Sequence, residues 1–400
     1  MPDIDRTARH PGDGRSACDG SGDGPGSRPQ PSTPPRFGTK RRATGRIVRM
    51  TTAPHPLVSR ARQLADDLLT PHAERVDQEG LPESHIEAVK RSGLLGVSAP
   101  VAYGGAGAPT AVARETAEIL AGACCSTWFV QQQHHTPVKL LADSPFPVRE
   151  RLLRPLATGE LLSGVAYAHV RAFPRVLVRA TPERGGWRFD GTVPWYTGWG
   201  LNDVMMLAGV SDSDEVVFAA AEAREQKGMR PSPPMRLAAL TAGRTVSLEL
   251  DGLWLPEEAL VLRTPQKEFA HIDRPRNTNA SPAAFGVAYA ALGLLEGDAD
   301  AKETACSLRA RLDTVRREAY ALADHPVPHK HLEERLTLKI QAYDLMRAAT
   351  TAAIVAGGGR SLTLAARAQR LAREGMFLLV QGQTAEVRKA HLGAFRHTST

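Results

Sequence analysis

Cysteine is scarce in this sequence, and its few residues lack the spacing of a metal or redox site. The four cysteines among 400 residues are Cys18, Cys124, Cys125 and Cys306. Two of them are adjacent and none forms a Cys-x-x-Cys pair, which excludes a zinc-ribbon or thioredoxin-type motif. Four thiols in a chain of this length do not make a disulfide framework, so we expect reduced thiols and a cytoplasmic protein.

The sequence also lacks long apolar runs and the short motifs of several large enzyme classes. No stretch of 18 or more apolar residues is present, so we expect no membrane span. There is no P-loop, no His-Glu-x-x-His, no Gly-x-Ser-x-Gly and no dinucleotide-binding glycine motif after a predicted strand. These absences argue against nucleotide hydrolases, zinc proteases, serine hydrolases and Rossmann enzymes, and we expect no metal site.

Excess positive charge is confined to the N-terminal tail. The formal net charge is +7, but residues 1–50 contain ten Lys/Arg and five Asp/Glu and therefore carry +5 of it. The rest of the chain is close to neutral, which argues against a nucleic-acid partner. Residues 1–50 also contain eight Gly and seven Pro. We therefore expect residues 1–54 to be a disordered tail, with Met50 as an alternative start.

Helical periodicity begins after this tail. Residues 58–80 and 82–96 place apolar residues three and four positions apart. The same pattern continues over residues 112–143, as one long helix or two. We predict an N-terminal helical domain over residues 55–162.

The next hundred residues alternate short apolar runs with turn residues. The clearest run is RTVSLELDGLWLP (244–256), in which Val246, Leu248 and Leu250 should face one side and Glu249 the other. Gly-Gly and Asp-Gly pairs between the runs supply turn chemistry. We predict a middle antiparallel β-domain over residues 163–265.

The C-terminal region returns to helical periodicity. One predicted helix face is formed by Leu332, Leu336, Ile340, Tyr343 and Met346, which recur at steps of three and four. Breaks near Gly297, 325–331 and 356–361 divide the region into about four long helices. We predict a C-terminal four-helix bundle over residues 266–400.

Four segments, which follow one another along the chain, resemble segments of a known protein family. Residues 81–108 run from a helix into PVAYGGAGA, and residues 186–210 contain GTVPWYTGWGLNDV. Residues 247–261 and 356–384 complete the series. Over most of residues 55–392 the chain resembles the acyl-CoA dehydrogenase superfamily. The resemblance implies an α+β fold of three parts: an N-terminal α-helical domain, a middle antiparallel β-domain and a C-terminal four-helix bundle.

The resemblance further implies a flavin, FAD or FMN, between the β-domain and the bundle. Trp195 and Thr197 match a family segment in which the threonine hydroxyl bonds the flavin near N5 and the tryptophan packs against its ring. An aromatic neighbour and a directed hydroxyl suit a planar ring with polar edges. The alternative is that Trp195 belongs to the core of the β-domain. Tyr167 and Ala168 would present backbone groups to the flavin edge.

The other cofactor-binding candidates are Gly357, Gly358 and Thr384. The two glycines fall where the family has a glycine cluster near the adenosine end of FAD, and glycine permits close backbone approach. A loop between two bundle helices would explain the same glycines without a cofactor. The family's glutamine before this cluster is replaced here by Ala353 or Ile354. That replacement favours a shorter flavin, or a flavin supplied by another protein.

The catalytic carboxylate of the family is missing from its usual slot. Removal of a weakly acidic C–H proton needs a general base, and Gln381, which holds the slot here, is a neutral amide. Asp273 lies near the position that a minority of the family uses, although it would also suit a helix N-terminus. His135, like His134 and His391, is a candidate for a different role, the hydrogen-bonding group near the flavin that a monooxygenase of this fold would need, because imidazole titrates near neutral pH. The alternative for each is a histidine at the surface or at the edge of the core.

Three functions stay open from the sequence. The first is a flavin-dependent oxidoreductase that oxidises the CH–CH bond of an acyl thioester or related small acyl substrate and passes electrons to an acceptor. The second is a two-component monooxygenase that uses O2 and reduced flavin from a flavin reductase. The third is a non-catalytic structural partner of a related flavoenzyme. The resemblance also implies a homodimer or homotetramer.

Overall fold

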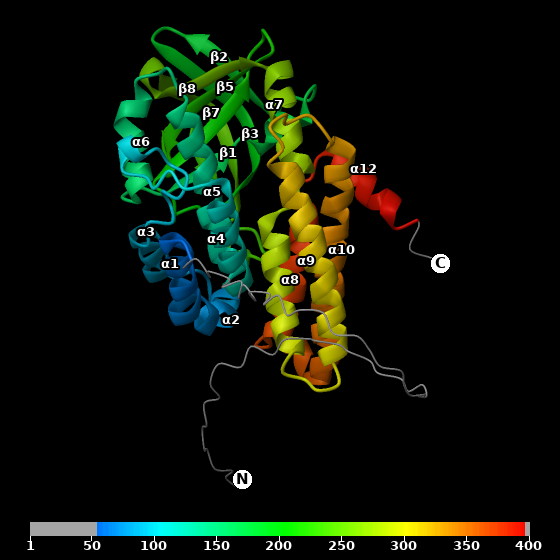
Figure 1. Ribbon diagram of the computed structural model, residues 1–400. Coiled ribbons are helices and arrows are strands. Elements are labelled where there is room, and N and C mark those ends of the chain that lie inside the picture. The colour runs from blue at the N-terminus through cyan, green and yellow to red at the C-terminus, as the bar shows by residue number, and fades with distance from the viewer. Residues whose placement is uncertain (1–53, 397–400) are drawn as a thin grey trace, which may run out of the picture. The chain divides into compact units, whose positions relative to one another are not determined.

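The computed structural model describes residues 54–396, and the predicted disordered tail of residues 1–54 lies almost wholly outside that range. Three parts follow one another along the described chain: helices, a β-sheet and a second set of helices (Figure 1). The predicted fold is therefore confirmed. No helix within residues 54–396 combines the length and apolar character needed to cross a membrane.

The first part consists of α-helices with short connections. Their bounds are α1 Pro56–Leu64, α2 Thr70–Glu79, α3 Glu83–Arg91, α4 Thr110–Ala123, α5 Cys125–Ala142 and α6 Val148–Thr158, and a π-helical turn, Ala65–Leu69, joins α1 to α2. The long helical stretch of residues 112–143 is two helices, because Cys124 has an extended backbone with φ −152° and ψ 102°. In the glycine turn between α3 and α4, a Cβ on Gly105 would lie 2.3 Å from the Ala99 carbonyl oxygen.

The middle part is one eight-stranded sheet. Its strands are β1 Ser163–Ala166, β2 Val178–Glu183, β3 Gly186–Tyr196, β4 Val204–Val210, β5 Glu215–Glu222, β6 Met229–Pro231, β7 Val246–Pro256 and β8 Leu260–Pro265. The order across the sheet is β6-β7-β3-β2-β4-β5-β8, with β1 beside β4. The pairings are antiparallel except that β4 runs parallel to both β1 and β2.

Both faces of the central strands are covered. Met205 and Leu207 of β4 pack with Phe189 and Leu248 from β3 and β7, whereas Met206 packs on the opposite face, against α5 and α6. Because both faces are buried, β4 is apolar throughout and does not alternate. Next to the edge strand β6 the pattern differs, since β7 buries Val246, Leu248 and Leu250 and exposes Glu249, as the sequence predicted.

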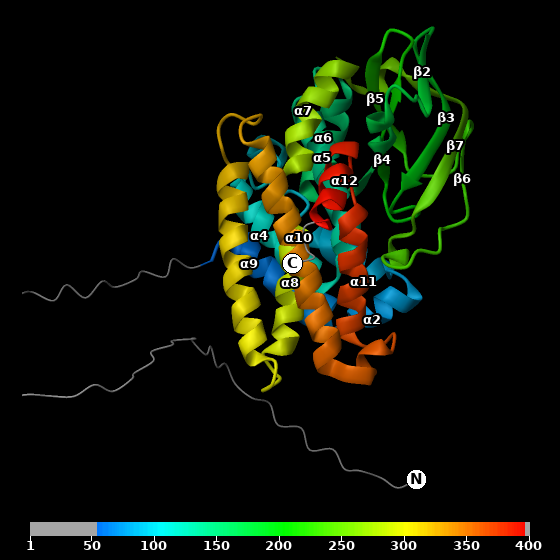
Figure 2. The same ribbon diagram turned by 90° about the vertical axis from the view of Figure 1, so that its right-hand side faces the viewer.

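The third part contains the bundle. Its helices are α7 Gln266–Thr278, α8 Pro282–Leu295, α9 Lys302–Ala323, α10 Leu332–Gly357, α11 Arg367–Val380 and α12 Ala385–Ala394. The four long helices α8, α9, α10 and α11 run side by side (Figure 2), and α10 packs on each of the other three. The predicted breaks near residues 297, 325–331 and 356–361 coincide with the ends of α8, α9 and α10.

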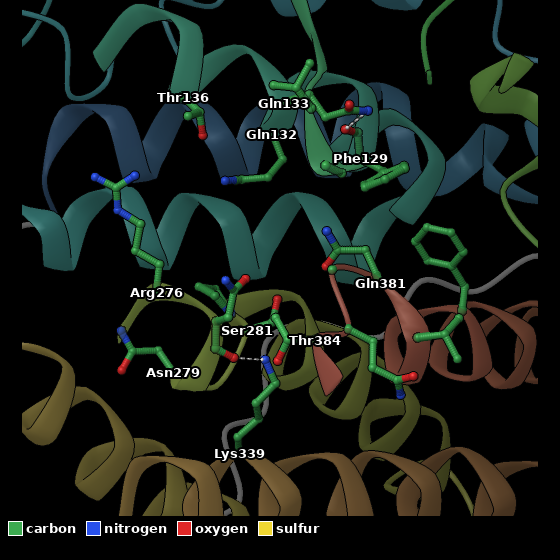
Figure 3. A pocket seen from close by; sticks show the side chains of 18 of the residues that line it. Phe129, Gln132, Gln133, Thr136, Arg276, Asn279, Ser281, Lys339, Gln381 and Thr384 are labelled. Atoms are coloured by element: carbon green, nitrogen blue, oxygen red, sulfur yellow. Dashed lines mark hydrogen bonds between the residues drawn. The ribbon is translucent and has the colours of Figure 1, made fainter. Parts of the chain in front are cut away.

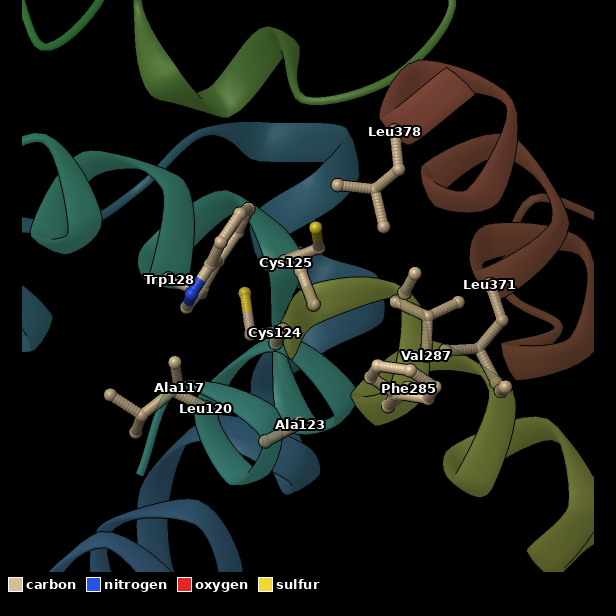
Figure 4. Packing of buried hydrophobic residues seen from close by; sticks show 14 of the residues in the cluster. Ala117, Leu120, Ala123, Cys124, Cys125, Trp128, Phe285, Val287, Leu371 and Leu378 are labelled. Carbon is tan, nitrogen blue, oxygen red and sulfur yellow. The ribbon is translucent and has the colours of Figure 1, made fainter. Parts of the chain in front are cut away.

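One apolar core joins the first part of the chain to the bundle. Cys124, Cys125 and Trp128 lie beside Phe285 and Leu378 in this core (Figure 4). The helices approach closely where α4 crosses α8. A Cβ on Gly286 would lie only 2.1 Å from the Glu118 carbonyl oxygen, so only glycine permits this approach.

Buried charge ties α11 to the N-terminal helices. Arg370 is fully buried and holds Glu374 at 2.7 Å and Glu74 of α2 at 3.0 Å. Glu374 also accepts a hydrogen bond from the Cys125 backbone N–H. This set of bonds fixes α2, α5 and α11 together at the base of the region where the β-sheet meets the bundle.

Candidate functional site

A cavity of about 1260 Å³ lies between the β-sheet and the C-terminal helices. Its walls come from α5, from the segment after β1, from the end of β3, from α7 and the turn that follows it, from α10, and from the loop between α11 and α12. Figure 3 shows side chains of α5 facing those of α10 and the α11–α12 loop across this space. Segments that are far apart in the sequence therefore build one site.

The end of β3 supplies an aromatic face and a hydroxyl to the cavity. Tyr196 points into the sheet core, where its hydroxyl accepts a hydrogen bond from Asn202 at 2.9 Å. Its neighbour Trp195 must point the other way, because side chains alternate along a strand. The Trp195 side chain lines the cavity and is 58% exposed. Thr197 lines it as well, with its hydroxyl 2.9 Å from that of Thr245.

The segment after β1 forms the adjoining wall. Tyr167 lines the cavity and packs edge-on against Phe218, with 5.4 Å between the ring centroids. Burial raises the pKa of its phenol, so the hydroxyl stays protonated at neutral pH. Ala168 follows it and begins a short 3₁₀-helix, Ala168–Ala172, which carries Arg171 into the same wall.

Arg171 and Asp273 form a bidentate ion pair in this wall. Nε and Nη2 of Arg171 lie 2.7 Å and 2.9 Å from the two carboxylate oxygens. The Asn277 amide donates a further bond of 2.6 Å to Oδ2 of the same carboxylate. Burial lowers the pKa of the guanidinium, but the bonds to Asp273 outweigh this, and the net shift is upward. Asp273 is the only carboxylate among the described residues that line the cavity.

The loop between α11 and α12 closes one end of the cavity. Gln381 is the C-terminal cap residue of α11, and its half-buried amide side chain lines the cavity. Gly382 has a φ of +62°, a conformation that suits glycine and lets the chain turn sharply. Thr384 caps the N-terminus of α12, accepting a hydrogen bond from the Val387 N–H at 3.2 Å.

Lys339 of α10 brings a buried amine into the cavity. Its Nζ donates a hydrogen bond of 2.7 Å to the Asn277 carbonyl oxygen, and the residue is 6% exposed. Burial, with the positive charge of Arg171, lowers its pKa to about 8. This residue could not be recognised as a site residue from the sequence, since a lysine on a long helix normally faces solvent.

The structure brings seven of the predicted site residues together. The predicted residues that line the cavity are Tyr167, Ala168, Trp195, Thr197, Asp273, Gln381 and Thr384. The other three, His135, Gly357 and Gly358, are not among its lining residues. The glycines lie where α10 ends, and Gly358 begins the 3₁₀-helix Gly358–Leu362.

The candidate histidines have local partners instead. His135 lies 2.7 Å from the Gln131 amide, and burial lowers its pKa to about 4. His134 is fully buried, with its two ring nitrogens bonded to the Leu156 carbonyl and the Ser163 N–H, and burial lowers its pKa to about 3. Both rings are therefore neutral at physiological pH. His391 packs edge-on against Tyr343, with 5.3 Å between the centroids.

The lining residues fit the ring portion of a flavin. An isoalloxazine is broad, flat and polar at its edges, and the β-side wall offers the Trp195 face, the Thr197 hydroxyl and the backbone at Ala168. The cavity volume is ample for such a ring and a small substrate. Within residues 54–396, no three His, Cys, Asp or Glu side chains are grouped as metal ligands.

Comparison with known families and structures agrees with this geometry. Residues 53–160 match the family described as acyl-CoA dehydrogenase, N-terminal domain. The sequence matches no curated protein. Butyryl-CoA dehydrogenase from Megasphaera elsdenii has a similar structure, with a TM-score of 0.73 at 16% identity over 85% of this chain and 97% of that one.

Two further solved structures are similar. A glutaryl-CoA dehydrogenase from Mycobacterium smegmatis, in complex with FADH2, gives a TM-score of 0.69 at 18% identity over 86% of this chain and 94% of that one. The structure of PigA with FAD and proline gives a TM-score of 0.73 at 15% identity, over 85% of this chain and 96% of that one. Identities this low establish the fold alone. The predicted resemblance to the acyl-CoA dehydrogenase superfamily is confirmed, since residues 53–160 match that family's N-terminal domain and the described chain has its fold.

Proposed function

We propose that this protein is a flavin-dependent oxidoreductase that oxidises the CH–CH bond of an acyl thioester or related small acyl substrate. The observation that carries the proposal is the cavity between β-sheet and bundle, in which Trp195, Thr197 and Tyr167 share a wall. These are the residues that the family resemblance assigns to the flavin. A bound flavin would supply the hydride acceptor that amino-acid side chains lack.

The chain's own residues would hold the ring and orient the substrate. Trp195 would cover the ring, and the Thr197 hydroxyl, already paired with Thr245, would donate to its edge. Beside this wall, Phe129, Gln132 and Thr136 of α5 also line the cavity. Their mixed apolar and neutral polar character suits a short acyl chain with one carbonyl.

Gln381 is best explained as a binding residue. Its amide can donate a hydrogen bond to a substrate carbonyl and accept one from a neighbouring group, but it cannot take a proton from carbon. Asp273 is the remaining candidate for proton acceptor among the described cavity residues. To act as a base, it would have to exchange one of its bonds to Arg171 or Asn277 for the substrate proton.

One observation favours a second candidate function, oxygenation by a two-component monooxygenase. Both oxygens of Asp273 are engaged by Arg171, so the described part of the cavity offers no free carboxylate. Reaction of O2 with a reduced flavin requires no protein base to deprotonate a carbon acid.

The visible absorbance spectrum of the purified protein, recorded without oxygen, tests both candidates. Loss of the oxidised-flavin band on addition of a mixed acyl-CoA panel would support the dehydrogenase. A protein that keeps this band, yet in a separate aerobic measurement changes the rate at which O2 reoxidises reduced flavin relative to free reduced flavin, would support the oxygenase. Failure to bind oxidised or reduced flavin would overturn the proposal in either form.

A pair of tryptophan variants ties this test to the cavity. Trp195→Ala removes an exposed ring that lines the cavity, whereas Trp254→Ala removes an exposed ring of β7 that does not. Flavin binding should weaken only in the first variant. Equal loss in both variants would argue that the flavin binds elsewhere.

A further inference from the structure

Lys339 is a buried amine without a counter-charge. Among residues 54–396 it forms no ion pair with a carboxylate, and the Asn277 carbonyl oxygen is the one hydrogen-bond acceptor bonded to its Nζ. An ammonium group has three donors, so two are left for other partners. Buried charges in proteins are normally paired, because leaving one unpaired in a low-dielectric site is costly. The Tyr343 ring, whose centroid lies 5.6 Å from Nζ, carries no charge, so an ammonium without a counter-charge in a cavity wall indicates a site for an anionic ligand.

The carboxylates of the adjoining helices α7 and α12 already form ion pairs with arginines. Asp273 is bound by Arg171 at two points and by Asn277 at a third. Glu386, at the start of α12, is bound by Arg274 at 2.8 Å and 3.1 Å. Neither acid can neutralise Lys339 without breaking an existing ion pair.

Two helix N-termini add positive potential to the same cavity. Ser281 precedes α8, which has 14 residues, and Thr384 precedes α12, which has 10 residues. Both residues line the cavity together with Lys339 (Figure 3), and α10 packs on both helices. The N-terminus of a helix favours anions through its free N–H groups and its dipole. The Ser281 hydroxyl makes no capping bond to its own helix.

We infer that Lys339 and the N-termini of α8 and α12 bind a carboxylate group of the substrate, so that the substrate is a dicarboxylic acyl compound. This inference rests on the proposed function for the reaction itself, but adds a binding site that the reaction does not require. The charge of one carboxylate matches that of one ammonium. A phosphate, with up to two negative charges, would be better matched by Lys339 together with Arg276, but Arg276 is exposed, whereas Lys339 is buried.

Binding of two thioesters that differ in one carboxylate tests the inference. Glutaryl-CoA and pentanoyl-CoA have the same acyl length, and only the first carries a terminal carboxylate. Calorimetry on the full chain should show glutaryl-CoA binding about tenfold more tightly, as one charge-assisted contact provides. Equal binding of the two by the wild-type protein would overturn the inference without any variant.

Variants of Lys339 test whether this residue causes the preference for glutaryl-CoA over pentanoyl-CoA. Lys339→Met should bring the two affinities to within about twofold of each other, by loss of glutaryl-CoA binding alone, and Lys339→Arg should restore part of the preference. Lys389→Met, on the exposed part of α12, should leave the preference unchanged. A preference that survives in Lys339→Met would contradict the assignment.

Flavin-binding measurements show whether Lys339 binds a substrate carboxylate or a flavin phosphate. If Lys339 binds a flavin phosphate, Lys339→Met should weaken FMN but not riboflavin, and the substrate assignment would be wrong. If the wild-type protein binds no flavin yet prefers glutaryl-CoA, the proposed function fails while the carboxylate site stands. If flavin binds and is bleached by thioesters without any preference for the carboxylate, only the inference fails.

Discussion

Arg171, near the start of the β-domain, and Asp273 of α7 lie 102 residues apart in the sequence and meet in a two-point ion pair at 2.7 Å and 2.9 Å. The pair joins the 3₁₀-helix after β1 to α7, so it fixes the bundle-side wall of the cavity to the sheet-side wall. This position explains why the one carboxylate in the described cavity is bound to a guanidinium.

We expect Asp273→Asn and Arg171→Gln to destabilise the protein by similar amounts, about 2–4 kcal/mol each, because each leaves its partner's charge buried and unpaired. Urea unfolding of both single variants and of the double variant measures this. The double variant should lose much less than the sum of the two. A general base would behave differently: Asp273→Asn would lose turnover by about a thousandfold, while Arg171→Gln would retain it.

We expect Trp195→Ala to weaken flavin binding about tenfold, since stacking of one aromatic ring contributes about 1 kcal/mol or slightly more. The unfolding free energy should change little, because the ring is 58% exposed and packs in no core cluster. Fluorescence quenching of the flavin during titration gives the affinity. Trp254→Ala, at 46% exposure, is the control and should leave the affinity unchanged.

The pH dependence of stability should report on Lys339. Its pKa in the folded chain is about 8, below the ordinary value of 10.5, so the unfolded chain binds more protons between these values. The unfolding free energy without ligand should therefore rise from pH 8 to pH 10 by about 2 kcal/mol. Lys339→Met should remove this rise and be the more stable protein at pH 7.

The other charged or titratable groups around Lys339 are Arg171, Asp273, Tyr343 and His391. The tyrosine has a pKa raised by burial, so it keeps its proton throughout this range, and the histidine pKa is lowered by burial. Neither contributes a rise between pH 8 and pH 10. A stability that is flat over this range in the wild-type protein would contradict the assignment of a buried, charged amine.

Gly286→Ala should lower the unfolding free energy by about 1–3 kcal/mol, the usual cost of forcing an extra methyl group into a packed core. The added Cβ would lie 2.1 Å from the Glu118 carbonyl oxygen, so α4 and α8 would have to separate. Gly293→Ala in the same helix has no atom within 4 Å of the new Cβ and should be neutral or slightly stabilising. Thermal unfolding of the two variants compares them directly, and equal melting temperatures would contradict the packing argument.

The sequence was most informative where local pattern and burial agree. In β7, alternation predicted that Val246, Leu248 and Leu250 are buried, and they are. Trp195 and Thr197 could be predicted as site residues because the segment that contains them, residues 186–210, resembles a segment of the family that contacts the flavin. The break at Cys124 was less clear, since no proline or glycine marks it.

The helix α10 shows why some residues of the candidate site could not be predicted from the sequence. Periodicity selected Leu332, Leu336 and Ile340, yet these are half-buried, and Lys339 is buried beside them. A pattern of apolar residues places charged residues on the solvent side, so it cannot find a lysine that faces a cavity. The contact of Lys339 with Asn277 spans 62 residues and appears only when α7 packs on α10.

The glycine contact between α4 and α8 has a consequence for motion. Because Gly286 lets the two helices approach to backbone distance, they cannot shear or separate without losing that packing, and the helices that continue from them hold two walls of the cavity at a constant spacing. Opening by domain rotation is therefore disfavoured. Gly382, between α11 and α12, is not packed in this way, since a Cβ there would meet nothing within 4 Å. We expect ligand exchange to depend on displacement of this loop on the microsecond to millisecond timescale.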